Sequence, residues 1–61
     1  MEPLALRYKD AAYLLSVSES TVARMVRTGK LPAVLVVGSR RIKRVDVERY
    51  LNQLPTTTEG A

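Results

Sequence analysis

The segment from residue 16 to residue 32 constrains the fold most, because it holds the start, the apolar face and the end of one short helix. Ser18 is a residue type that caps helix N-termini, whereas Gly29 with Pro32 soon after it is typical of a helix end. Three apolar residues between these signals recur at helical spacing, namely Val22, Met25 and Val26. The sequence therefore predicts a helix from about Glu19 to about Thr28.

A second helical pattern ends just before this one. Its apolar residues follow the spacing i, i+3, i+4, i+7 and are Tyr8, Ala11, Ala12 and Leu15. Asp10 falls in the first turn, where a carboxylate suits the helix dipole, and the N-cap position falls at Arg7. The intervening turn contains only Ser16, Val17 and Ser18, and we expect Val17 to fill the gap between the helices. Two short helices joined in this way predict a helix-turn-helix unit.

The rest of the chain predicts a hairpin and a third helix. Two β-prone runs, 33–37 and 40–44, flank a Gly38-Ser39 pair that we interpret as the turn. Ile42 is expected to face the core, which places its two neighbours on the opposite side of the strand. The last helical stripe comprises Val47, Tyr50, Leu51 and Leu54.

The ends of the chain complete the expected architecture. Residues 1–6 are interpreted as a first strand or arm, and Asp46 as a first-turn acid of the third helix. Pro55 ends that helix, and the polar segment 55–61 is expected to be a disordered tail. The prediction is one domain over residues 1–54. Its class is α+β, mainly α, with a helix-turn-helix, a two-stranded wing and a C-terminal helix.

Composition restricts the function. The chain has 61 residues, no Cys and no His, so it lacks thiolate ligands and the usual general base. We expect no catalytic residue, no cofactor and no metal, and thus no enzyme. The longest apolar run, 33–37, is far shorter than the roughly 20 residues that span a bilayer, and a cytoplasmic protein without a membrane partner is expected. The net charge of +4 favours a polyanionic partner.

The polar face of the predicted second helix has the chemistry that DNA requires. Arg can bind guanine through two hydrogen bonds in the major groove, and Ser or Thr can bind bases or phosphates. The candidate DNA-binding residues of this recognition helix are Ser18, Glu19, Ser20, Thr21, Arg24 and Arg27. Those of the wing are Ser39, Arg40, Arg41 and Lys43.

Each candidate also has a purely structural interpretation. The arginines of the helix could be ordinary solvated residues, and those of the wing could be charges that protect a strand edge. Ser18 is a helix cap first, and any contact with DNA is secondary.

The motifs as a whole resemble a known family. The stretch "DAAYLLSVSESTVARMVRTGKLPAVLVVGSRRIKRVDVERYL" resembles the excisionase-type winged helix-turn-helix, which is related to the DNA-binding domains of MerR regulators. The resemblance covers about residues 6–54. It implies a phage or integrated-element protein that binds attachment-site DNA, bends it and directs a cognate integrase toward excision. It also implies binding that is often cooperative, and a place on the nucleoid of a bacterial host. Because one module of this size covers too little DNA to be selective alone, we expect neighbouring copies to touch on the DNA through the apolar strand around Leu35 or the terminal segments.

Other functions stay open from the sequence. A small transcriptional repressor needs the same DNA contacts as an excisionase. A protein-interaction module such as an antitoxin would keep the fold, although a basic recognition face does not favour it. RNA binding is a lesser alternative, because no aromatic-rich sheet is predicted for stacking bases. The target sequence and the spacing of its sites cannot be read from the chain.

Overall fold

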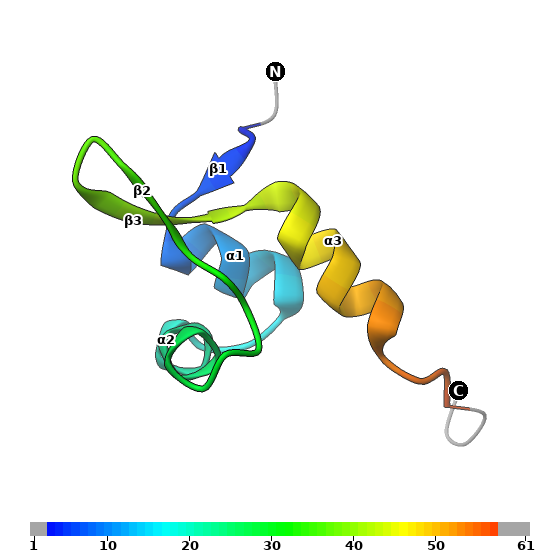
Figure 1. Cartoon of the computed structure of the whole chain (residues 1–61). Helices are drawn as coiled ribbons and strands as arrows, with labels where there is room; N and C mark the ends of the chain where they lie inside the picture. The colour runs from blue at the N-terminus through cyan, green and yellow to red at the C-terminus, as the bar shows by residue number, and fades with distance from the viewer. Residues whose placement is uncertain (1–2, 58–61) are drawn as a thin grey trace.

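The structure is a computed structural model that describes residues 3–57. In chain order it contains β1 (Ala5–Leu6), α1 (Tyr8–Leu15), α2 (Glu19–Arg27), β2 (Val34–Val36), β3 (Ser39–Lys43) and α3 (Arg44–Gln53), as Figure 1 shows. The strands form one antiparallel sheet in the order β1-β3-β2. Helix α1 packs against α2, β3 and α3. This is the predicted winged helix-turn-helix, with the β2–β3 hairpin as the wing.

The signals around α2 act as predicted. The Ser18 hydroxyl oxygen accepts a hydrogen bond from the Thr21 backbone N–H at 3.2 Å, which caps the helix. At the other end, Gly29 adopts a φ of +84°, a conformation that glycine accepts at little steric cost. The N–H groups of Gly29 and Lys30 then donate to the carbonyls of Val26 (3.1 Å) and Met25 (2.7 Å), so that α2 ends in a Schellman motif.

Helix α1 ends in the same hydrogen-bond motif as α2, but its residue of positive φ is not a glycine. Ser16 has a φ of +59°, and its N–H donates to the Tyr13 carbonyl at 3.2 Å. The N–H of Val17 donates to the Ala12 carbonyl at 3.0 Å. The prediction that Val17 fills the gap between the helices is wrong, since its side chain is 39% exposed. The two alanines of α1, Ala11 and Ala12, are buried there instead, at 0% and 4% exposure.

Helices α1 and α3 begin without a side-chain cap. Their N-cap residues are Arg7 and Lys43, neither of which makes a capping hydrogen bond. The aspartate in the first turn of each helix instead accepts a hydrogen bond from a nearby arginine. Arg7 Nε donates to Asp10 at 3.0 Å, and an arginine one turn further along α3 donates to Asp46 at 2.9 Å. Both acids occupy the helix positions expected from the sequence.

The core lies where α1, α2 and the sheet meet. Its buried cluster comprises Leu6, Ala11, Ala12, Val22, Ile42 and Val47, with Tyr8, Leu15, Val26 and Ala33 packed against it. Met25 is also buried, as predicted, and so is Leu31, which was not. The expected stripe of α3 is only partly buried. Val47 is in the core, but Leu51 and Leu54 are 46% and 47% exposed because nothing among the described residues covers them.

The wing differs from the prediction by one residue. Val36 pairs with Ser39, so the turn is Val37-Gly38 and not Gly38-Ser39. Both turn residues have positive φ, 50° and 80°, which defines a type I′ turn, the kind whose twist suits a hairpin. Ser39 therefore belongs to β3, and Arg44 is already the first residue of α3.

The C-terminal segment is only partly described. Residues 55–57 are in neither a helix nor a strand. The predicted disorder of residues 58–61 lies outside the described residues. Within residues 3–57, no helix is both long and apolar enough to cross a membrane.

Candidate nucleic-acid interface

The outer face of α2 carries the predicted recognition residues. Val22 and Met25 fix the inner face of the helix in the core, at 0% and 7% exposure. Because the helix has 3.6 residues per turn, the opposite face is directed outward. Of the six candidates in this region, only Thr21 is half-buried, whereas the exposed ones are Ser18, Glu19, Ser20, Arg24 and Arg27.

A cluster of hydroxyl groups marks the N-terminus of α2. The Ser18 hydroxyl lies 2.9 Å from that of Thr21 and 3.2 Å from that of Ser20. Ser18 is therefore engaged as the helix cap, which agrees with its structural interpretation. The backbone N–H groups of the first turn lie beside these hydroxyls, as in helix N-termini that bind phosphate oxygens.

The wing places its predicted residues on two faces. Arg40 lies on the same face of β3 as the buried Ile42, since side chains alternate along a strand. It pairs across the hairpin with Leu35, and both line a depression that Val26 of α2 also lines. Arg41 and Lys43 lie on the opposite face, as predicted from the position of Ile42.

The other wing candidates differ in exposure. Ser39 and Lys43 are exposed, whereas Arg41 is half-buried and donates a hydrogen bond to the Arg40 carbonyl at 3.2 Å. The structure thus brings Arg40 toward α2 and leaves the opposite face of the wing with a separate basic surface.

Charges are distributed unevenly along the chain. Between Ser18 and Lys43 there are six cations and one acid, whereas the rest of the chain has four cations and five acids. The arginine just before α1 and the two arginines of α3 pair with acids, in Arg7–Asp10, Arg44–Glu48 and Arg49–Asp46. Within residues 3–57, no cation of α2 or of the wing forms an ion pair. These cations are therefore available to an external polyanion.

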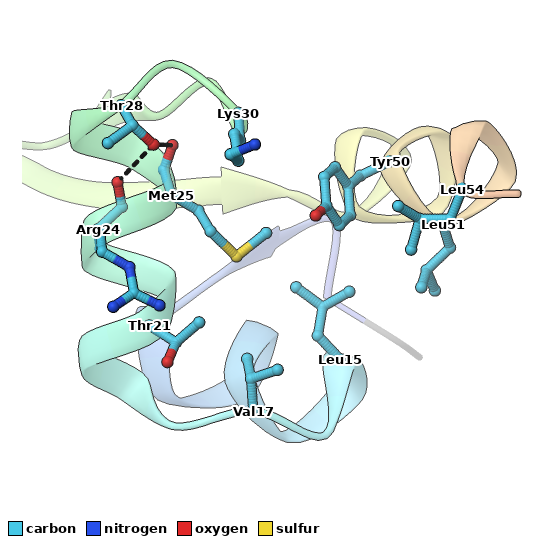
Figure 2. Close-up of a pocket in the computed structure, with 10 residues that line it drawn as sticks. All are labelled: Leu15, Val17, Thr21, Arg24, Met25, Thr28, Lys30, Tyr50, Leu51 and Leu54. Carbon is cyan, nitrogen blue, oxygen red and sulfur yellow. Dashed lines mark hydrogen bonds between the residues drawn. The ribbon is translucent and has the colours of Figure 1, made fainter.

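One cation of this region was missed by the sequence interpretation. Lys30 follows the glycine that ends α2 and lines a groove between α2 and α3, together with Arg24 (Figure 2). Its position after a C-terminal glycine is a signal, because basic residues near a helix C-terminus interact favourably with its free carbonyls. Among the described residues there is no group of three or more potential metal ligands.

Comparison with known proteins agrees with this geometry. Neither the curated proteins nor the solved structures gave a match to the chain. The family model described as "Helix-turn-helix domain" matches residues 6–55, from the end of β1 to just beyond α3. The chain therefore belongs to the helix-turn-helix domain family, a family of sequence-specific DNA-binding domains that includes excisionase-like proteins.

Proposed function

We propose that α2 enters the major groove of double-stranded DNA and that the wing lies along the adjacent backbone. The observation that supports this proposal most is the pairing pattern of the arginines. Arg7, Arg44 and Arg49 form ion pairs with acids of the chain, whereas the arginines of α2 and the wing have no acidic partner among residues 3–57. Guanidinium groups without acidic partners, gathered on a groove-sized helix and a neighbouring hairpin, match the phosphates and base edges of a duplex.

The individual residues have different proposed roles. Arg24 is the candidate for base recognition, because it lies on the exposed face in the middle of α2. Arg27, at the end of α2, is assigned to a phosphate. Ser20 and Thr21 are assigned to the backbone at the helix N-terminus, and Glu19 to a cytosine amino group or to the helix dipole. In the wing, Ser39, Arg40, Arg41 and Lys43 are assigned to phosphates.

Salt dependence tests the electrostatic part of this proposal. About four to six phosphate contacts would give a slope of roughly −3.6 to −5.4 in a plot of log affinity against log salt. The measurement is a fluorescence-anisotropy titration of one labelled duplex at several salt concentrations. An affinity independent of salt would rule out this mode of binding.

We further propose that the biological role is that of an excisionase. In this role the protein binds attachment-site DNA, bends it and helps a cognate integrase to excise an integrated element in a bacterial host. Membership of a family that includes excisionase-like proteins supports this role. A nucleoid location in the cytoplasm would follow from it. A transcriptional repressor of the same fold is the second candidate, since the same contacts with DNA serve both functions.

The two roles are separated by an excision assay. The protein is added to an integrase encoded beside its own gene and a plasmid that carries the two attachment sites of the element. An excisionase increases formation of the excised circle, and its Arg24→Ala variant does not. A repressor leaves recombination unchanged but lowers transcription from a promoter that carries its site.

Cooperation between neighbouring copies is the last part of the proposal. A single module of this size buries only roughly 600–1,000 Å² on DNA, so high selectivity needs several copies side by side. Leu35 is 71% exposed on β2, an edge strand of the sheet, and is a candidate for the contact with the next copy, as are the terminal segments.

Gel shifts on duplexes with one site and with several sites test this contact. If Leu35 contacts a neighbouring copy, Leu35→Lys should lose cooperativity and keep its single-site affinity. Equal affinities per site on both duplexes for the unmodified protein would contradict the cooperative model. Retained cooperativity in Leu35→Lys would assign the contact to the terminal segments.

A further inference from the structure

An apolar groove separates α2 from α3, on the side of α2 that faces away from the wing. It has a volume of about 530 Å³. Figure 2 shows residues of α2 on one wall and the C-terminal end of α3, with Leu54 just after it, on the other, with the end of α1 and the following turn below. The apolar lining residues are Leu15, Val17, Met25, Tyr50, Leu51 and Leu54. We call this feature the α2–α3 groove.

The groove exists because α3 extends past the core. Val47 is seated in the core at 2% exposure, but the next apolar positions of the same stripe, Leu51 and Leu54, are about half exposed. In Figure 1 the second half of α3 leads away from the other helices. Exposed leucines at helical spacing beside a buried methionine form a surface that favours an apolar partner.

The charges at the groove select the kind of partner. Two cations line it, Arg24 from α2 and Lys30 from the following turn, and no acid does. The nearby acids of α3, Asp46 and Glu48, are paired with arginines of the same helix. A molecule that occupies the groove must therefore present apolar side chains to its apolar lining residues and carboxylates to Arg24 and Lys30.

Two other possible occupants of the groove, a second copy of the chain and DNA, match its lining residues less well. A second copy of this chain carries a net charge of +4 and would bring further cations to Arg24 and Lys30. DNA would satisfy the two cations but would leave Leu51 and Leu54 without apolar contacts. An amphipathic helix with an apolar stripe bordered by Asp or Glu satisfies both surfaces, by the helix-in-groove mode of recognition.

We propose that the α2–α3 groove is a docking site for an acidic amphipathic helix of a protein partner. Its leucine-type side chains pack against Met25, Leu51 and Leu54, and its carboxylates pair with Lys30 and Arg24. This proposal goes beyond DNA binding and does not depend on it. Since Arg24 is also assigned to DNA, partner and DNA would compete for one side chain.

A pair of designed peptides tests the proposal. The probe is a fluorescein-labelled helical peptide of about five turns, with Leu every three or four positions and Glu at the flanking positions. Its twin has Lys in place of each Glu. We expect the acidic peptide to bind the full chain at least about tenfold more tightly than the basic one, measured by anisotropy at protein concentrations where sedimentation shows a monomer.

Two leucine variants locate the binding site. Leu54→Gln removes an apolar group from the groove, whereas Leu14→Gln changes a leucine of equal exposure, 47%, that lies on α1 outside it. We expect about a tenfold loss of peptide affinity for Leu54→Gln and less than about a twofold loss for Leu14→Gln. Circular dichroism checks that both variants are folded, and Lys30→Gln should reduce the preference for the acidic peptide.

Three results would overturn the proposal. Equal binding of the two peptides would show that the cations do not select the partner. Equal losses for Leu54→Gln and Leu14→Gln would place the peptide elsewhere. A self-associating protein that Leu54→Gln converts to a monomer would show that a second copy covers the groove. DNA affinity is measured separately in the anisotropy titration, so failure of one proposal leaves the other standing.

Discussion

The turn of the wing places a β-branched residue where the backbone disfavours it, and this makes a sharp prediction. Val37 has a φ of +50°, and a left-handed conformation costs a residue with a Cβ about 1–2 kcal/mol. Its side chain is 100% exposed, so no packing compensates. Asn followed by Gly is the preferred pair for a type I′ turn, because Asn tolerates this conformation. Val37→Asn should therefore stabilise the protein by about 1 kcal/mol.

The assay is thermal unfolding followed by circular dichroism. In a domain of this size, 1 kcal/mol corresponds to a rise in Tm of about 4–8 °C. Gly38→Ala is the matched control. Gly38 has a φ of +80°, and an added Cβ would meet no atom within 4 Å, so any loss of stability reports the backbone alone. We expect Gly38→Ala to lower the Tm. If Gly38→Ala destabilises the protein while Val37→Asn leaves the Tm unchanged, the argument about Val37 is refuted.

Three further predictions concern other parts of the chain. Arg24→Ala should lose about 1–3 kcal/mol of binding free energy on the specific site and much less on random DNA, whereas Arg41→Ala should weaken binding to both more evenly. Competitive titrations measure the ratio of the two affinities, and an unchanged ratio for Arg24→Ala would assign base recognition to another residue. Ser16→Gly should raise stability by roughly 1 kcal/mol in urea unfolding, because Ser16 has a φ of +59°, and a loss of stability would mean that its hydroxyl has a structural role. Asp46→Asn should lower stability by about 0.5–1 kcal/mol in urea unfolding, since the carboxylate lies in the first turn of α3 and accepts from Arg49 at 2.9 Å. An unchanged or raised stability would contradict this electrostatic origin.

The helix-turn-helix could be predicted closely because its signals are local. Ser18 and Gly29 set the ends of α2 through hydrogen bonds with residues three to five positions away. The apolar spacing of α1 and α2 likewise identified the faces that meet. These helix ends depend on residues about one helical turn apart, so a short stretch of sequence is enough to predict them.

The wing and α3 were predicted less well because distant contacts decide them. Around Gly38 the sequence permits a turn with glycine first or glycine second, and the observed register places Ile42 inward opposite Leu6. The stripe of α3 identifies residues that share a face, but only the tertiary structure shows that Leu51 and Leu54 extend beyond the core. The α2–α3 groove could not be predicted for the same reason.

The pairing of β1 with β3 has a consequence for how the chain folds and how it can be joined to other domains. Leu6 lies opposite Ile42, and the Arg44 N–H donates to the Leu4 carbonyl at 2.8 Å. Closing the loop of chain between Leu6 and Ile42 costs about 3 kcal/mol of chain entropy. During synthesis α1 and α2 can therefore form first, while the sheet must wait for β3. A domain fused before β1 would transmit mechanical load directly to the central strand, whereas one fused after Thr57 would load only α3.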